Sequence, residues 1–202
     1  MIGNDVVDLL DAEARPGATH PRFDGRVFTA QELALLGASE RATSLRWMLW
    51  AAKEAAFKVA RKLEPRLPFV PRRFAVELSA SGEGWVAHEG RRFHLRVRTD
   101  GQRVHALASE EPLQARALAS GILALPSAAR DPGSALREAA CQALASWLGA
   151  EPAVLCIRRA GRIPRLWLRD APAPLDLSLS HHGRLGAFAA VALEGDLGGT
   201  AA

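Results

Sequence analysis

The feature that most constrains the fold is an order of segments that occurs twice in the chain. A segment with helical periodicity, residues 43–62, is followed by short runs of alternating apolar and polar residues, and the same order begins again at residue 134. Helical periodicity predicts a helix buried along one face, and alternation predicts half-buried strands. The sequence therefore predicts an α+β fold of two similar lobes, each a helix packed on a small antiparallel sheet. We expect a pseudo-twofold relation between the lobes and a site in the cleft between them.

Composition sets the boundaries of these lobes. We expect the first lobe over residues 1–109 and the second over residues 134–193. Residues 110–133 are rich in Ala, Pro and Ser, which is typical of a connector, and within them residues 114–124 favour a short helix. The connector holds no motif, so we expect its deletion to matter little. Residues 194–202 are polar and Gly-rich and predict a disordered tail.

Composition also limits the class of protein. Hydrophobic residues make up 49% of the 202 positions, enough for a sizeable core. The only cysteines, Cys141 and Cys156, suit reduced core thiols better than a disulfide framework. The first ten residues lack the basic-then-apolar pattern of a leader, and the longest uncharged apolar run, residues 117–129, is too short to span a bilayer. We therefore expect a cytoplasmic monomer that does not bind membranes.

The charge balance points to acidic partners. A net charge of +4 favours nucleic acid, a phosphorylated cofactor or an acidic protein. The arginines are scattered, however, and no nucleic-acid-binding motif accompanies them. Nucleic acid is therefore the minor hypothesis.

The helix expected over residues 43–62 has two unlike faces. One face carries an apolar stripe at three- and four-residue spacing: Leu45, Met48, Leu49, Ala52, Ala56 and Val59. The other face carries Trp47, Trp50, Glu54, Lys58 and Arg61. The plainer interpretation of Glu54 and Lys58 is an exposed i,i+4 ion pair. Two tryptophans beside them favour a second buried face instead.

Two further carboxylates, Asp5 and Asp8, lie in GNDVVDL, a predicted strand that Gly3 opens. An aspartate at such a position is more often a turn or cap residue. Carboxylates that meet in a cleft repel one another, however, and hard oxygen ligands suit a hydrated divalent cation such as Mg²⁺.

The stretch LSLSHHG, residues 177–183, predicts a strand near the other end of the chain. It shows Ser178 and Ser180 on the face opposite its leucines and ends in His181 and His182. A Ser-His pair at a strand end is more often an ordinary turn, yet polar groups presented there can also hold a ligand.

Three segments together resemble the 4′-phosphopantetheinyl transferase superfamily. GNDVVDL, LWAAKEAAFK and LDLSLSHHG match its G-x-D, W-x-x-K-E-x-x-x-K and S-H motifs, and RVFTAQELALL and RRAGRIPRL resemble its flanking stretches. In the two-lobed, surfactin-synthetase-activating type the Ser-His segment comes first, whereas here it comes last. The chain therefore resembles a two-lobed transferase with its halves in exchanged order.

The resemblance implies a metal site. Asp5 and Glu54 match the metal ligands of the family. The two-lobed type often has a third acid at the position of Val7, which leaves the third ligand open and allows water to replace it. Asp8 ranks lower, because alternation along a strand turns it away from the face of Asp5.

The resemblance also implies a site for coenzyme A. Lys58 matches the lysine that meets the phosphate and pantetheine end of the cofactor, and Lys53 of the same motif is assigned to cofactor binding. Ser180 and His181 match the pair that holds the phosphorylated ribose, and Arg162 stands where a basic phosphate contact is usual.

The activity implied is transfer of 4′-phosphopantetheine from coenzyme A to a serine of an apo acyl or peptidyl carrier protein, with Mg²⁺ or Mn²⁺. Glu54, Lys58 and His181 would be the catalytic residues, and Glu54 is the candidate base. Such carriers serve fatty-acid, polyketide and nonribosomal peptide biosynthesis. The alternatives are a non-catalytic homologue that binds coenzyme A or a carrier, and an Mg²⁺-dependent phosphohydrolase.

Overall fold

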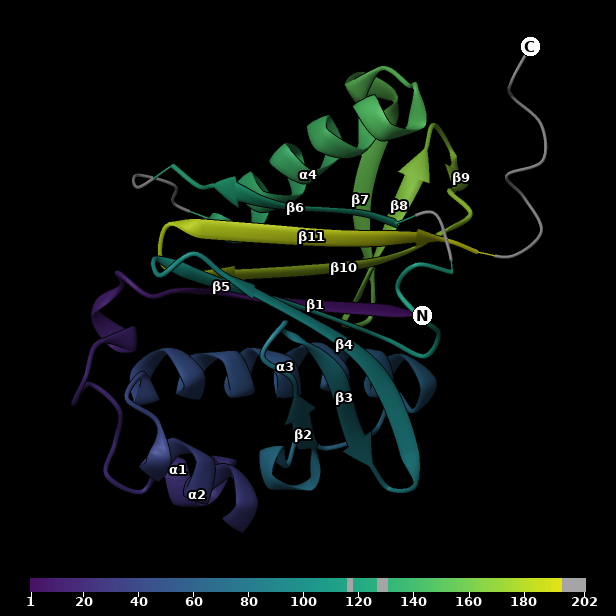
Figure 1. The fold of residues 1–202 in the computed structure, drawn as a ribbon. Helices are drawn as coiled ribbons and strands as arrows, with labels where there is room; N and C mark the ends of the chain where they lie inside the picture. Colours follow the sequence, from purple (N-terminus) through teal and green to yellow (C-terminus); the bar gives the residue numbers. More distant parts are fainter. Residues whose placement is uncertain (116–117, 127–130, 194–202) are drawn as a thin grey trace.

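The computed structural model describes residues 1–115, 118–126 and 131–193, and the predicted tail lies outside them. The described residues form an α+β fold, as predicted, with antiparallel sheets and helices in two groups (Figure 1). Each group has one long helix against a sheet, and we call the groups the first and the second lobe. No helix of the described residues is long and apolar enough to cross a membrane.

The first lobe is a five-stranded antiparallel sheet in the order β1-β5-β4-β3-β2 with helix α3 packed across it. Its elements are β1 (Ile2–Asp8), α1 (Phe23–Val27), α2 (Ala30–Ala38), α3 (Ala42–Leu63), β2 (Ala75–Leu78), β3 (Glu83–His88), β4 (Arg91–Thr99) and β5 (Arg103–Ser109), with 3-10 turns at Ala12–Ala14 and Pro71–Arg73. The predicted stripe of α3 lies in the core, where Leu49, Ala52 and Val59 are almost fully buried. On the other face Trp47 is buried as well, while Trp50, Glu54, Lys58 and Arg61 are half-buried, so that face is partly shielded from solvent.

The second lobe contains two three-stranded antiparallel sheets, β10-β11-β6 and β7-β8-β9, around helix α4. Its elements are β6 (Leu118–Ala124), α4 (Pro132–Leu148), β7 (Leu155–Ala160), β8 (Ile163–Leu168), β9 (Ala171–Pro172), β10 (Leu175–His182) and β11 (Leu185–Ala192), with a 3-10 turn at Pro152–Val154. Helix α4 ends at Gly149, which adopts the left-handed conformation with a φ of 62°.

The prediction of a short helix within residues 114–124 is wrong, because these residues contain strand β6. The strand pairs antiparallel with β11, from Leu118 opposite Val191 to Ala124 opposite Leu185. Its partner lies far along the chain, so local periodicity did not reveal the pairing. The expectation that deleting the connector would matter little therefore loses its basis, since the connector contains β6, which pairs with β11 in a sheet of the second lobe.

The two lobes meet where β10 runs parallel to the free edge of β1 (Figure 1). Backbone N–H groups of β1 donate to side chains of β10: Ile2 to Asp176 Oδ2 (2.6 Å), Asn4 to Ser178 Oγ (2.9 Å) and Asp8 to His182 Nδ1 (3.2 Å). We call these contacts the edge ladder. The ladder explains why polar residues alternate along β10, because they satisfy a sheet edge that would otherwise be unpaired.

The end of β11 lies beside the beginning of β1. Ile2 packs in one apolar cluster with Ala189 and Val191, and Leu193 and Met1 line the same small cavity. Figure 1 shows the end of β11 close to the N-terminus. This is the neighbourhood that an exchanged order of the two halves requires.

Candidate active site

A pocket of about 430 Å³ lies between the lobes. Strand β1 and helix α3 of the first lobe line it, together with the first two turns of α4, the strands β7, β8 and β10, and the β7–β8 connection of the second lobe. The pocket brings together six of the predicted site residues: Asp5, Glu54, Lys58, Arg162, Ser180 and His181. Residues that are distant in the sequence thus converge on one cavity.

Close packing of α3 on β1 puts Glu54 and Lys58 at this pocket. A Cβ atom on Gly3 would lie 2.0 Å from the carbonyl oxygen of Ala55, so only glycine allows the two backbones to approach this closely. Lys58 Nζ then donates to Asp5 Oδ1 (2.9 Å) and to the backbone carbonyl of Asn4 (2.7 Å). Four residues of a helix rise about 6 Å along its axis, and two residues of a strand extend about 6.7 Å. Because these two lengths are similar, helix residues four apart, such as Lys58 and Lys62, reach strand residues two apart, Asn4 and Ile2.

The two carboxylates of the pocket hold their protons more tightly than usual. Burial, and then the neighbouring charge of Asp5, raise the pKa of Glu54 to about 7. Burial also raises the pKa of Asp5, although the positive charge of Lys58 and its hydrogen bond to Asp5 oppose the shift. A buried and a half-buried carboxylate that resist ionising together, with oxygen donors only, fit a divalent cation such as Mg²⁺.

Val7 and Asp8 add no ligand to this pair. The Val7 side chain is buried in the core of the first lobe. Asp8 is fully buried outside the pocket and accepts from Arg184 Nε (2.8 Å), whose hydrogen bonds lower the pKa of Asp8 to about 2. The low rank given to Asp8 agrees with this placement, and the chain offers no acid at position 7.

Lys53 does not reach the pocket, although it adjoins Glu54 in the sequence. Its side chain is fully buried, and Nζ donates to Glu32 Oε1 (2.9 Å) and to the carbonyls of Pro71 and Phe74. Consecutive helix residues point about 100° apart, so the motif sends Lys53 and Glu54 to different sides of α3. The structure therefore places Lys53 away from any bound cofactor, where it ties α3 to α2 and to the start of β2.

The two histidines at the end of β10 differ in what they contact. His181 is exposed at the pocket. His182 Nδ1 accepts the N–H of Asp8 in the edge ladder, and its ring lies 6.4 Å from that of Trp47. Ser180 lines the pocket while its Oγ accepts from the side-chain amide of Asn4 (3.2 Å).

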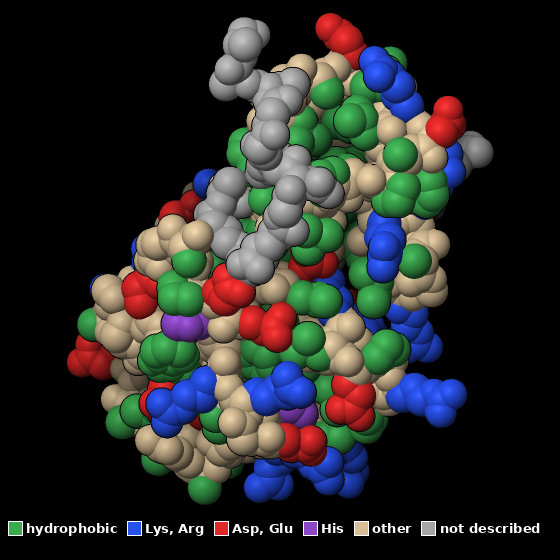
Figure 2. All heavy atoms as spheres, turned by 90° about the vertical axis from the view of Figure 1, so that its right-hand side faces the viewer, with side chains coloured by type: hydrophobic (Ala, Val, Ile, Leu, Met, Phe, Trp, Pro, Cys, Tyr) green, Lys and Arg blue, Asp and Glu red, His purple; other side chains and the backbone are tan. Residues whose placement is uncertain are grey.

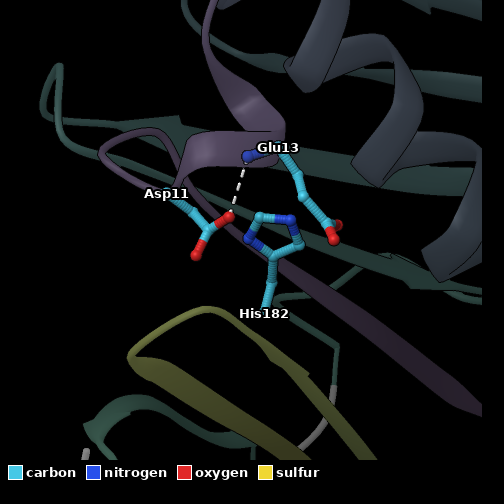
Figure 3. A group of neighbouring side chains, drawn as sticks. All are labelled: Asp11, Glu13 and His182. Carbon is cyan, nitrogen blue, oxygen red and sulfur yellow. Dashed lines mark hydrogen bonds between the residues drawn. The ribbon is translucent and has the colours of Figure 1, made fainter. Parts of the chain in front are cut away.

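Asp11, Glu13 and His182 form a second group of possible metal ligands, whose ligand atoms lie within 4.8 Å of one another (Figure 3). The hydrogen bond from Asp8 N–H to His182 Nδ1 puts the proton of a neutral ring on Nε2. The ring then offers no free lone pair to a metal. Asp5 and Glu54 therefore fit a cation better than this group does.

Sequence reasoning missed two arginines of the pocket, Arg137 and Arg159. Arg137 lies in α4 close to its N-terminus, and Arg159 lies on β7 near the connection that carries Arg162. The repeated arginines of RRAGR were a usable signal for Arg159, whereas nothing local distinguished Arg137.

A scan against family models matches residues 1–113 to the 4′-phosphopantetheinyl transferase superfamily. The match covers more than half of the chain and includes Asp5, Glu54 and Lys58, while Ser180 and His181 lie outside it. No curated protein matches the sequence. The extent of the family match, together with the shared pocket, shows that the chain belongs to the 4′-phosphopantetheinyl transferase superfamily.

Proposed function

We propose that this protein transfers 4′-phosphopantetheine from coenzyme A to a serine of an apo acyl or peptidyl carrier protein, in a reaction that depends on Mg²⁺. The observation that carries the proposal is the composition of the pocket. The acids Asp5 and Glu54 of the first lobe face the same cavity as Ser180 and His181 of the second. Neither lobe alone supplies both halves of this site.

The positive side chains of the pocket suit a ligand with several phosphates. Arg137, Arg159 and Arg162 line it from the second lobe, and Lys58 lines it from the first. Arginine binds phosphate oxygens through two parallel hydrogen bonds, which favours it at such a site. We assign Arg162, Ser180 and His181 to the phosphorylated ribose, and Lys58 to the pyrophosphate.

Asp5 and Glu54 would hold the cation. Bound Mg²⁺, or Mn²⁺ in its place, would neutralise charge on the pyrophosphate oxygens. Glu54, whose carboxylate faces the cavity, is our candidate for accepting the proton of the attacking serine. Lys58 and His181 would stabilise negative charge on the departing 3′,5′-adenosine bisphosphate.

The charge of the protein suits an acidic carrier. Its net charge is +4, and Figure 2 shows Lys and Arg side chains along the right-hand edge of the face drawn there. Cys141 and Cys156 are free, which fits the proposed cytoplasmic location. We propose that a single chain is active, because both halves of the site come from the same chain.

A second candidate function is binding of coenzyme A or a carrier protein without transfer. Val7 favours it, because its buried side chain leaves two carboxylates where the two-lobed type often has three acids. Transfer in the presence of the cation separates the two functions.

The deciding experiment incubates the protein with coenzyme A, Mg²⁺ and a panel of apo acyl and peptidyl carrier proteins, and measures the intact mass of each carrier. We expect one carrier to gain the mass of phosphopantetheine and to stay unmodified when EDTA is added. Binding of coenzyme A without any gain in mass would favour the non-catalytic function. Free phosphopantetheine released without a carrier would indicate a phosphohydrolase and contradict the proposal.

A further inference from the structure

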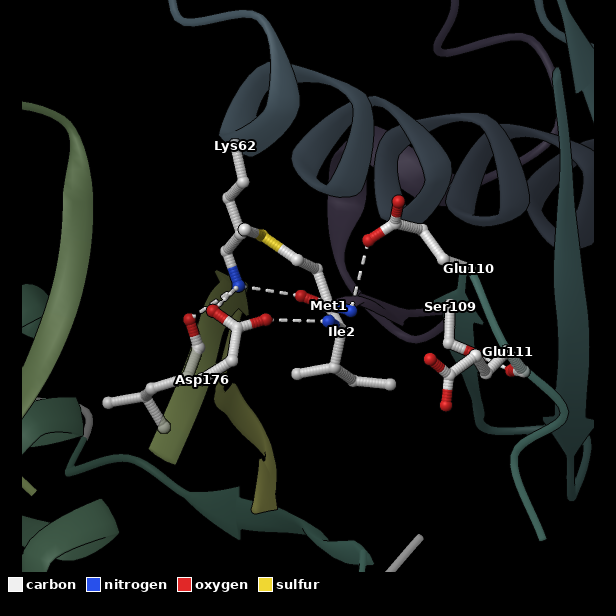
Figure 4. A network of polar contacts seen from close by, with 8 residues as sticks. Met1, Ile2, Lys62, Ser109, Glu110, Glu111 and Asp176 are labelled. Carbon is white, nitrogen blue, oxygen red and sulfur yellow. Dashed lines mark hydrogen bonds and ion pairs between the residues drawn. The ribbon is translucent and has the colours of Figure 1, made fainter. Parts of the chain in front are cut away.

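One ammonium group joins the three elements that build the site. Lys62, one turn beyond Lys58 on α3, donates through Nζ to Ile2 O of β1 (2.6 Å), Leu177 O of β10 (2.8 Å) and Asp176 Oδ1 (2.8 Å). The other carboxylate oxygen of Asp176 accepts the N–H of Ile2 (2.6 Å). Figure 4 shows Lys62 and Asp176 converging on Ile2 at the beginning of β1.

These contacts lie outside the pocket that holds the site. Neither Lys62 nor Asp176 lines it, so neither would touch coenzyme A there. The elements they join do line it, since β1 carries Asp5, α3 carries Glu54 and β10 carries Ser180. Any influence on the reaction would therefore pass through the placement of these elements.

Stability alone does not account for the pair. The side chains of Lys62 and Asp176 are only 5% and 11% exposed, so both charges lose most of their hydration. An apolar pair of similar volume often stabilises a core as well as a buried ion pair does. An apolar pair, however, makes no directional hydrogen bonds. It could not bind the carbonyls of Ile2 and Leu177 and the N–H of Ile2, which lie at fixed points of the two strands.

Directional hydrogen bonds also set the register of β10 against β1 in the edge ladder. Strand β10 is held to β1 by side-chain contacts, at Ser178 and His182 as well as Asp176. A shift of β10 along β1 would break all of them and would move Ser180 and His181 relative to Asp5. Lys62 adds a third element, α3, at the end of the ladder farthest from His182.

We propose that Lys62 and Asp176 are positioning residues that fix the register of β10 against β1, and thereby the spacing between the carboxylate pair and the Ser180-His181 pair. The consequence for catalysis rests on the proposed function, whereas the register itself does not. If the two residues fix the register, substitution of Asp176 should change hydrogen exchange along the whole edge ladder and the affinity for coenzyme A. If their role is only local, the change should be confined to the contacts of Asp176 itself.

The first test measures amide hydrogen exchange by NMR in the Asp176→Asn variant. The amides of Asn4 and Asp8 donate to Ser178 and His182, not to Asp176, so they report on the ladder as a whole. We expect both to exchange about tenfold faster or more, because the ladder opens more often. Faster exchange at Ile2 alone would show a local contact and overturn the proposal.

The matched control is Glu32→Gln. Glu32 is also a buried carboxylate bound to a lysine of α3 and to a backbone N–H, that of Val76, but all its partners lie in the first lobe. We expect it to lower the melting temperature while the exchange of Asn4 and Asp8 relative to global unfolding stays unchanged. Asp24→Asn, which breaks the less buried Arg46 pair of the first lobe, serves in the same way if Glu32→Gln does not fold.

The second test measures the affinity for coenzyme A by calorimetry, together with kcat and KM. For Asp176→Asn we expect the Kd and KM for coenzyme A to rise about tenfold, or about 1.4 kcal/mol, with a smaller change in kcat. Lys62→Arg keeps the positive charge, so we expect it to raise the Kd and KM for coenzyme A by a smaller factor. It also provides the test if Asp176→Asn does not fold. Normal affinity in folded protein of both variants would overturn the proposal.

The two tests separate this proposal from the proposed function. Wild-type protein that neither binds coenzyme A nor modifies a carrier would contradict the function. The exchange rates of Asn4 and Asp8 would still decide whether Lys62 and Asp176 fix the register.

Discussion

At the scale of single residues, the proposed chemistry depends most on Glu54, whose proton is held by burial and by the nearby charge of Asp5. Because its pKa is raised from 4.5 to about 7, the folded protein binds this proton more tightly than the unfolded chain does. The stabilisation is complete below pH 4.5 and is lost as the pH rises to about 7. Its upper limit is about 3 kcal/mol.

We therefore predict that Glu54→Gln removes a pH-dependent part of the free energy of unfolding. In the absence of divalent cations, the wild type should lose stability relative to the variant between pH 4.5 and 7, as measured by urea unfolding. His105, whose pKa burial lowers to about 4, titrates over an overlapping range but cancels in this difference. Mg²⁺ should stabilise the wild type more above pH 7 than below it, and an equal effect on the variant would contradict the assigned cation site.

The same substitution tests the proposed chemistry. Glu54→Gln keeps the volume of the side chain but removes its charge and its basicity, so we expect kcat/KM for transfer to fall at least about a hundredfold. The variant should keep its circular dichroism spectrum. Near-normal turnover in folded protein would contradict the role of Glu54 in catalysis and in metal binding.

The neighbouring histidines provide an internal comparison. His181→Ala should raise the KM for coenzyme A about tenfold or more, because the exposed ring lies at the pocket and is free to meet a phosphate. His182→Ala should instead lower the melting temperature, because it removes the acceptor of the Asp8 N–H. Steady-state kinetics and thermal unfolding of both variants measure these effects. An equal rise in KM for the two variants would contradict the assignment of His181, rather than His182, to coenzyme A.

Residue type and spacing were enough to select several residues that line the pocket, but not to predict the direction of every side chain. Asp5, Glu54, Lys58 and Ser180 all line the pocket that the motifs implied. Lys53 fits its motif equally well, yet its partner Glu32 comes from another helix, and no local pattern reveals such a contact.

At the scale of elements, the site depends on how closely β1 packs against α3. The contact needs Gly3, since any side chain there would collide with the carbonyl of Ala55. We predict that Gly3→Ala forces the strand and the helix apart, destabilises the protein by about 1–3 kcal/mol and weakens binding of Mg²⁺, because Asp5 and Glu54 sit on the two separated elements. Urea unfolding and calorimetry measure the two effects.

Gly37→Ala is the control for this prediction. The residue is in helix α2, and apart from its chain neighbours and the surrounding helix backbone no atom lies within 4 Å of the position its Cβ would take. It should leave cation binding unchanged and stability unchanged or slightly higher. An equal loss of cation binding in both variants would show that the strand-helix contact does not set the site.

Elements with strong periodicity were predictable, and those defined by distant partners were not. The predicted helix over residues 43–62 is observed as α3 over Ala42–Leu63, because its apolar stripe is continuous. Strand β6 was missed, because pairing with β11 decides its conformation. Alternation placed Ser178 on the face opposite the leucines but did not reveal its partner. Strand β10 lies beside a sheet edge from a different part of the chain, and the hydroxyl of Ser178 is buried there.

At the scale of the whole molecule, the repeated order of helix and strands was enough to indicate two lobes. It was not enough to show how they join. The joint consists of side-chain contacts to a strand edge, and such contacts leave no periodic signal in either strand. The exchanged order of the halves is an interpretation of the order of the motifs, and it requires the end of β11 to lie near the beginning of β1.

That neighbourhood leads to a prediction about chain connectivity. A chain that begins at Leu118, runs to Leu193, continues through a few Gly and Ser residues to Ile2 and ends at Leu113 keeps every described helix and strand, because the new break falls between β5 and β6. We expect it to fold and to transfer phosphopantetheine within about tenfold of the parent rate, since a short link suffices where two ends are already close. A second chain that begins at Ser134 lacks β6 and leaves the edge of β11 unpaired, so it should be markedly less stable. Thermal unfolding measures the stability of each chain, and the intact mass of the carrier measures its transfer activity. If the first chain folds but its Asp5 and His181 no longer serve one site, as shown by lost affinity for coenzyme A, the two halves are not exchanged lobes of a single transferase.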